Sequence, residues 1–349
     1  MPSDPSGADD GADEGADEGA DAGPTFVDFF CGMGGMTQGF KASGWRPLAA
    51  VDVNPDMIAC YAANNPDVDA RVASVTDEDA MQAFVQKWAG RVAAVVGGPP
   101  CQGFSQLNHN TRSILNPNNS LPSTYARLAV RLRPDHIVME EVPAVLNLDG
   151  GSVVRDVEAI LGDAGYTVRK QVLNAADYGV PQKRKRLILV ATLSGVPQPA
   201  FPPTPLPRRV PVAEAIDMPV DRAPEAPDQV RREITGQLRE KVEARERLGA
   251  AYNKKFDSSY RVMDVSQPSR TLSSGYHYPG NGANTLKHVD ADGTARYYSI
   301  STRDAMRIQG FPDDYVQPAL PISKLRVILA NAVPPGLARA VSASLRGGR

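Results

Sequence analysis

The sequence predicts an α/β fold with a parallel sheet, and three stretches carry this prediction. An apolar strand at residues 25–30 leads through a glycine-rich turn into a helix at 36–40. A second strand at 49–54 follows, and a third at 92–96 ends in a Gly-Gly-Pro-Pro turn. Strand, turn and helix repeated in this order build a parallel sheet whose ligand crevice lies at the carboxyl ends of the strands. We therefore expect a ligand site at that edge.

Length and composition are those of a globular protein. The chain has 349 residues, of which 42% are hydrophobic and 22% charged, which suits one large domain and a smaller one. No apolar run is long enough to cross a bilayer, and no secretory leader pattern opens the chain, so we expect a cytoplasmic protein without a membrane partner. The three cysteines, Cys31, Cys60 and Cys101, lack metal-ligand spacing, which argues for a reducing compartment and against zinc or disulfides.

Charge is distributed unevenly along the chain. Residues 1–23 carry eight acidic residues and no basic one, which leaves 32 acidic against 38 basic residues in the remainder. This opening segment has almost no large apolar side chain, so we expect a disordered acidic tail. The basic remainder favours a polyanionic partner. An alternative is that the tail mimics nucleic acid and shields the basic body.

The turn after the first strand, Cys31–Gly35, is typical of sites where backbone N–H groups at a helix N-terminus face a ligand. The same kind of turn also occurs where it only lets a helix pack closely. Asp52 ends the second strand about twenty residues further on, where a carboxylate binds the two ribose hydroxyls of a nucleoside cofactor.

The third strand leads into a loop that presents Cys101. Proline and glycine make this loop rigid, and Gln102 and Ser105 place hydrogen-bonding groups beside the thiol. The cysteine could be a nucleophile, or a small buried hydrophobic residue as many free cysteines are. Other stretches that fit the same chemistry favour the nucleophile.

Two further segments carry charged candidates. The apolar strand at 136–142 ends in Glu140, which is costly unless the strand ends at a polar crevice, whereas we expect Glu141 to be exposed. In the basic run before the strand at 186–191, Arg184 and Arg186 alternate with lysine. This spacing puts both guanidinium groups on one side of an extended segment, suited to phosphate or a base carbonyl, although such a run can also be a solvated surface.

Composition changes after residue 195. Prolines crowd residues 196–227, a highly charged helix is predicted at 228–250, and short strands with interleaved basic and aromatic residues follow, as in a nucleic-acid groove. The apolar pattern of 328–335 and the following helix predicts a return to the first core.

Together these motifs resemble the cytosine-C5 DNA methyltransferase family over about residues 25–345. The matching segments are Phe30–Gly35 for its first cofactor motif, Pro100–Ser105 for its nucleophile loop, Glu140 for its catalytic glutamate, Gln182-x-Arg184-x-Arg186, Arg307–Pro312 and Asn331–Pro335. The resemblance implies a Rossmann-like S-adenosylmethionine-dependent methyltransferase sheet with a second, smaller target-recognition domain. The expected parts are a tail at 1–23, a catalytic cofactor-binding domain at 24–195, a target-recognition domain at 196–300 and a returning segment at 301–349.

The resemblance also implies the reaction and its residues. The family methylates C5 of cytosine in duplex DNA through a covalent cysteine adduct on a flipped-out base, which would make this chain a monomeric bacterial enzyme of the nucleoid that needs no metal. The implied catalytic residues are Cys101, Glu140, Arg184 and Arg186, and the substrate-binding residues are Gln102, Ser105 and Gln182. The implied binding residues for S-adenosylmethionine are Phe30, Gly32, Gly34, Asp52, Val53, Pro100, Leu121, Asn331 and Val333.

The chain departs from the family pattern at several positions, and three of them bear on its activity. Ser74 stands where the family has an acid against the adenine, Asn118 falls in its Asp-x-Arg-Asn element, and Glu141 replaces an asparagine. Two alternatives therefore stay open, namely the same chemistry on RNA or a cytosine nucleotide, and a weakly active DNA-binding protein that keeps the fold.

Overall fold

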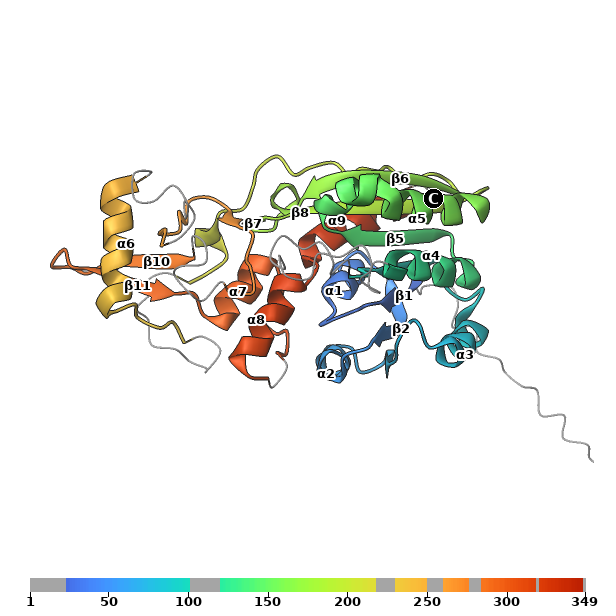
Figure 1. Ribbon diagram of the computed structural model, residues 1–349, viewed down its shortest axis with the longest axis horizontal. Coiled ribbons are helices and arrows are strands. Elements are labelled where there is room, and N and C mark those ends of the chain that lie inside the picture. The colour runs from blue at the N-terminus through green and yellow to red at the C-terminus, as the bar shows by residue number, and fades with distance from the viewer. Residues whose placement is uncertain are drawn as a thin grey trace, which may run out of the picture.

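The computed structural model describes residues 23–100, 120–217, 230–249, 260–275, 284–317 and 320–347. Figure 1 shows an elongated molecule with a large α/β lobe at one end and a smaller lobe, with α6 (Gly236–Leu248), β10 (Thr285–Val289) and β11 (Ala295–Ser299), at the other. The helices α7 (Thr302–Gln309) and α8 (Ile322–Asn331) lie between them. No helix in these ranges is both long enough and apolar enough to cross a membrane.

A seven-stranded sheet forms the large lobe, in the order β3-β2-β1-β4-β5-β8-β6. β1 to β5 run parallel, and β8 is antiparallel to both of its neighbours. The prediction of a mostly parallel α/β sheet is therefore confirmed. The strands are β1 (Thr25–Phe29), β2 (Arg46–Asp52), β3 (Asp69–Val72), β4 (Ala94–Gly97), β5 (His136–Glu141), β6 (Tyr166–Asn174) and β8 (Lys185–Leu193).

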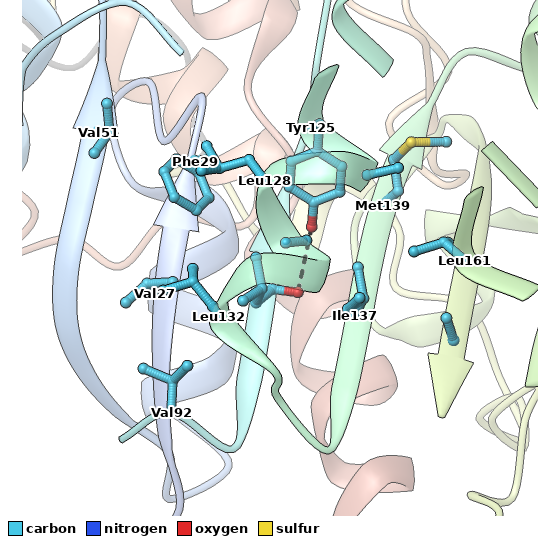
Figure 2. Packing of buried hydrophobic residues seen from close by; sticks show 14 of the residues in the cluster. Val27, Phe29, Val51, Val92, Tyr125, Leu128, Leu132, Ile137, Met139 and Leu161 are labelled. Atoms are coloured by element: carbon cyan, nitrogen blue, oxygen red, sulfur yellow. Dashed lines mark hydrogen bonds between the residues drawn. The ribbon is translucent and has the colours of Figure 1, made fainter. Parts of the chain in front are cut away.

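Helices cover both faces of this sheet because its central strands are apolar on both faces. On one face α3, α4 and α5 pack against alternate strand residues such as Phe29, Ile137 and Met139 (Figure 2). The Tyr125 hydroxyl reaches into this core and donates to the carbonyls of Val95 and Val138, at 3.3 and 2.8 Å. On the other face α1 and α9 pack together over the remaining strand residues. The helices are α1 (Gly35–Lys41), α2 (Pro55–Asn64), α3 (Glu78–Trp88), α4 (Leu121–Leu132), α5 (Ser152–Asp163) and α9 (Pro335–Arg346).

The smaller lobe packs α6 (Gly236–Leu248) on the antiparallel pair β10 (Thr285–Val289) and β11 (Ala295–Ser299). The helix predicted at 228–250 begins only at Gly236. Before it, the Ile234 N–H bonds to the Tyr297 carbonyl, so the chain joins the hairpin first. Gly236, the first residue of the helix, has a φ of +55°. This left-handed backbone conformation favours glycine, because a Cβ would strain it.

Short elements complete the fold. β7 (Gln182–Lys183) pairs in parallel with β9 (Ser269–Arg270) between the two lobes. The 3₁₀ helices are η3 (Pro143–Gly151), η4 (Ala175–Tyr178) and η5 (Val212–Glu214). α7 (Thr302–Gln309) and α8 (Ile322–Asn331) lead back to the large lobe. There α9, in red in Figure 1, packs against α1, in blue, on the core of the large lobe.

Candidate active site

A cavity of about 340 Å³ lies at the carboxyl ends of β1, β2, β4 and β5. This is the edge at which parallel α/β sheets bind ligands. The connection between α8 and α9 closes its other side. Its lining consists of Asp28, Phe30, Cys31, Gly32, Met33, Gly35, Met36, Asp52, Val53, Asn54, Met57, Gly98, Pro100, Glu140, Val327, Ile328, Asn331, Ala332 and Val333.

Glycines let the turn after β1 curl beneath this cavity. Gly32 and Gly34 have φ values of +53° and +89°, which favour glycine, and a Cβ at Gly34 would lie 2.9 Å from the Tyr315 hydroxyl. A Cβ at Gly35 would overlap the Val333 carbonyl oxygen, so this glycine lets α1 approach the α8–α9 connection closely. Gly32 lines the cavity, whereas Gly34 belongs to the same turn but lies outside the cavity lining.

Asp52 holds the turn and faces the cavity. Its Oδ2 accepts the Gly32 N–H and its Oδ1 accepts the Asn54 N–H, both at 2.9 Å. Burial raises the pKa of the Asp52 carboxyl above its usual range, and these backbone donors oppose that rise. Each oxygen keeps a lone pair, so the carboxylate can still accept hydrogen bonds from a ligand.

Asp28 is a second cavity carboxyl, which the sequence analysis did not single out. It accepts a 2.7 Å hydrogen bond from the Thr37 hydroxyl, which also lies 2.9 Å from the Tyr61 hydroxyl. Burial raises the pKa of Asp28 to about 7, and the negative charge of Asp52 adds to the rise. An acid between Val27 and Phe29 in an apolar strand is the same signal that singled out Glu140.

The cavity is electrostatically one-sided. Its described lining contains three carboxyl groups, from Asp28, Asp52 and Glu140, and no lysine, arginine or histidine. Apolar side chains make up most of the rest. Carboxyl groups in such low-dielectric surroundings favour a ligand with a positive charge and an apolar part.

The Glu140 carboxylate lies at the cavity wall, one residue before the end of β5. Arg186, near the start of the antiparallel neighbour β8, places Nε 2.6 Å from Glu140 Oε1. The Arg186 Nε–H does not point at Glu140 Oε1 with the geometry of a hydrogen bond. Glu140 Oε1 is therefore buried without a hydrogen-bond donor among the described residues. On the other side, a Cβ at Gly98 would lie 3.2 Å from Glu140 Oε2. The glycine therefore leaves room for this carboxylate.

Arg184 lies buried beside this pair. Its Nε and Nη2 have no hydrogen-bond partner within the ranges that the structure covers. Burial lowers the pKa of Arg184 to about 9, and the positive charge of Arg186 lowers it further, whereas Glu140 opposes this. Lys183 and Lys185 are exposed, so the alternation predicted for this segment is confirmed, and the alternative of a wholly solvated run is wrong for Arg184.

The remaining predicted residues lie in different places. Gln182 is fully buried, and its amide bonds to Gln309 and to the Leu272 N–H. Leu121 begins α4 and lies outside the cavity lining. Cys101, Gln102, Ser105 and Asn118 lie outside the described residues, although Pro100, directly before Cys101, lines the cavity.

Two positions where the chain departs from the family pattern are described. The Ser74 hydroxyl bonds to that of Thr76, at 2.7 Å, and Ser74 lies outside the cavity lining. Glu141 is only 4% exposed, so the expectation of an exposed side chain is wrong. The reason is that η3 and α5 cover the far face of the sheet beyond the end of β5.

Comparison with known proteins identifies the fold and the chemistry. Residues 24–346 match the family of C-5 cytosine-specific DNA methylases. The chain belongs to this family. The Type II methyltransferase M.XorII of Xanthomonas oryzae is 31% identical over 92% of the chain and 84% of its own length. The Type II methylase M.HgiDII of Herpetosiphon aurantiacus is 28% identical over 92% and 94%.

Solved structures share the architecture of this cytosine methylase. A DNMT2 mutant from Spodoptera frugiperda matches with a TM-score of 0.67 at 18% identity, covering 93% of the chain and all of that protein. The methyltransferase EhMeth of Entamoeba histolytica also has a TM-score of 0.67, at 14% identity over 93% and 98% of the two chains. The predicted family, fold and enzyme type, a DNA (cytosine-5-)-methyltransferase, are therefore confirmed.

In this methylase the cavity gathers most of the residues expected to bind the cofactor. Seven of the nine line it, namely Phe30, Gly32, Asp52, Val53, Pro100, Asn331 and Val333, and Glu140 lies among them. Sequence motifs did not mark Met57, Val327 and Ile328, because α2 and α8 bring them in through tertiary packing.

Proposed function

We propose that the protein transfers the methyl group of S-adenosylmethionine to C5 of cytosine in DNA through a covalent adduct with Cys101 on a flipped-out base. One observation carries this proposal. The cavity wall contains Glu140 with Arg186 against its carboxylate, and also Pro100, which immediately precedes the nucleophile in the chain. The cofactor cavity and the base-binding carboxylate therefore share one space.

The residues of the cavity fit the cofactor. S-adenosylmethionine supplies an electrophilic methyl group on a positively charged sulfonium. Three carboxyl groups without a lysine or arginine among the described lining suit that charge and an ammonium group. Asp52 would accept the ribose hydroxyls, and apolar residues such as Val53 and Met57 would contact the adenine. We assign Phe30, Gly32, Asp52, Val53, Pro100, Asn331 and Val333 to this binding.

The chain's own residues would then carry the chemistry on the base. The Cys101 thiolate adds to C6, the electron pair of the C5–C6 double bond moves to C5, and C5 takes the methyl group. Loss of the C5 proton and departure of the thiolate restore the double bond. Glu140 would hold N3 and the exocyclic amine, while Arg186 and Arg184 orient Glu140 and the base. The target carbon is inaccessible in a duplex, so the base must leave the stack.

The smaller lobe is proposed to contact the DNA. The expected recognition segment, residues 196–300, contains α6, β10 and β11, and its strand β9 pairs with β7, which carries Gln182. In Figure 1 this lobe lies beyond β7, which leads along the chain into β8, and this placement supports the proposal.

Methyl transfer from labelled cofactor tests the function. We expect label to enter duplex DNA and Cys101→Ser to abolish the transfer. DNA with 5-fluorocytosine should trap the wild-type enzyme covalently, because fluorine at C5 cannot leave as a proton does, and should not trap Cys101→Ser. Label in RNA alone would correct the substrate. Tight DNA binding without cofactor binding would instead identify a DNA-binding protein that keeps the fold.

A further inference from the structure

Glu141 is a buried acid that the proposed reaction does not use. It ends β5, and its side chain is 4% exposed. Its Oε2 accepts the Val142 N–H at 2.8 Å. Its Oε1 is buried without a hydrogen-bond partner within the described part of the chain. Among the described residues, one backbone donor is therefore all that compensates the burial of this carboxyl group.

The surroundings of Glu141 are apolar. Side chains alternate along a strand, so Glu140 faces the cavity and Glu141 faces the opposite side of the sheet. Its register partner on β8 is Leu187, which packs with Val145, Leu148, Val153 and Val154 of η3 and α5. An ionised carboxylate placed there with a single donor is costly, whereas a neutral carboxylic acid is far less so.

Charged neighbours do not remove this cost. Glu140 on the same strand disfavours a negative charge, and Arg186 on β8 only partly offsets this and already lies against Glu140. Lys185 on β8 is exposed. On η3 and α5, Asp149 and Arg155 are exposed and bond to the Ser152 hydroxyl and the Gly150 carbonyl.

We infer that Glu141 is a positioning residue that works as an uncharged carboxylic acid. In this form it fixes the turn from β5 into η3 by accepting the Val142 N–H. Arg186 then pairs with Glu140 alone. Once ionised, it would repel Glu140 and compete for Arg186. The consequence for catalysis rests on the proposed function, whereas the consequence for folding does not.

The pH range of the effect follows from the burial. Burial raises the pKa of Glu141 from its ordinary 4.5 to about 8, and the charge of Glu140 contributes. Between these values the folded chain holds one proton more than the unfolded chain. The contribution of Glu141 to the free energy of unfolding is therefore fully present below its ordinary pKa. It falls as pH rises towards about 8, and no further loss occurs above that pH.

Urea unfolding at pH 5 to 9 gives the unfolding constants of the full-length wild type and of Glu141→Gln. Glutamine keeps the shape of the side chain and cannot ionise. The ratio of the two unfolding constants should change about tenfold per pH unit between pH 5 and 8 and stay constant above. Glu240→Gln, which alters an exposed acid of α6, is the matched control and should run parallel to wild type. Parallel curves for Glu141→Gln, or its failure to fold, would overturn the inference.

Methyl transfer over the same pH range gives a second readout. We expect Glu141→Gln to match wild type at pH 7 and to keep its kcat above pH 8, where the wild-type rate falls. A merely structural role would lower both rates in the same proportion at every pH, which would count against the inference. No transfer by either protein at any pH would refute the proposed function and leave the folding result standing.

Discussion

The Glu140 carboxylate is held from two sides by single residues. Arg186 approaches Oε1 to 2.6 Å, and the missing side chain of Gly98 leaves space beside Oε2. Gly98 also lines the cavity, directly after β4. The position of the carboxylate thus depends on an ion pair and on an absent methyl group.

Gly98→Ala should therefore impair catalysis more than folding. Its Cβ, at 3.2 Å from Oε2, would push the carboxylate by a few tenths of an ångström, and misplaced catalytic groups cost about tenfold or more in rate. We expect kcat to fall about tenfold while the midpoint of thermal unfolding stays near that of wild type. Gly162→Ala, in an exposed part of α5 where a Cβ meets nothing within 4 Å, is the control and should keep wild-type kcat. An unchanged kcat for Gly98→Ala would show that Oε2 is free to move.

The sequence correctly predicted which acids at the ends of apolar strands line the cavity. It failed for a residue whose burial depends on what covers the other face of the sheet. Asp52 and Glu140 both line the cavity at the predicted edge of the sheet. Glu141 was expected to be exposed because a strand alone does not reveal whether η3 and α5 cover its other face. Asp28 was missed, although an acid flanked by Val27 and Phe29 carries the same information.

The helices α1 and α9 pack so closely that their contact requires a glycine. A Cβ at Gly39 would lie 2.5 Å from the Pro335 carbonyl oxygen, the Ala338 Cβ and the Arg339 nitrogen. Backbone atoms cannot give way here as a flexible side chain would. The last helix of the chain therefore docks on the first one through this glycine.

We expect Gly39→Ala to destabilise the protein by about 2 kcal/mol, because overpacking at a rigid contact forces the helices apart. Urea unfolding at fixed pH measures the change. In α5, Gly162→Ala is the matched helical substitution and should stabilise by about 0.5 to 1 kcal/mol, because alanine favours the helix and no neighbour is within reach. Equal effects of the two substitutions would contradict the close packing of α1 and α9.

Element predictions succeeded where the apolar period was clear. β1 and β5 begin and end within about one residue of the expected positions, because buried strands have a clear apolar pattern. The charged stretch at 228–250 predicted one helix, yet residues 232–234 pair with β11 before the helix begins at Gly236. Long-range pairing with β11 decides this, and local composition does not encode it.

On the scale of the whole molecule, two buried glutamines connect the smaller lobe to the cavity. Gln182 on β7 bonds to Gln309 at the end of α7 and accepts the Leu272 N–H at 3.2 Å, just after β9. Gln309 donates to the carbonyls of Leu329 and Ala332, both at 2.9 Å. Ala332 lines the cavity, so the network runs from the lobe junction to the cavity wall.

The resemblance of motifs predicted the family, and with it a role for Gln182 in binding substrate. The structure gives its amide protein partners instead, which motif spacing alone does not show because α7 and β9 follow about 90 to 130 residues later in the chain. Its part in substrate binding stays a prediction.

A double-mutant cycle on Gln182 and Gln309 tests this connection. Gln182→Ala leaves the Leu272 N–H and the Gln309 Oε1 without a partner in a buried site, which should cost about 3 kcal/mol, and Gln309→Ala should cost a similar amount. Both substitutions break the same contact, so the double variant should lose about 1 to 2 kcal/mol less than the sum. Urea unfolding measures these values, with Gln171→Ala, at an exposed position of β6, as the control. Gln309→Ala should also bind S-adenosylmethionine several-fold more weakly in calorimetry, because the Ala332 carbonyl at the cavity wall loses its donor. Additive losses of stability would mean that the two glutamines act independently and that the lobes are joined elsewhere.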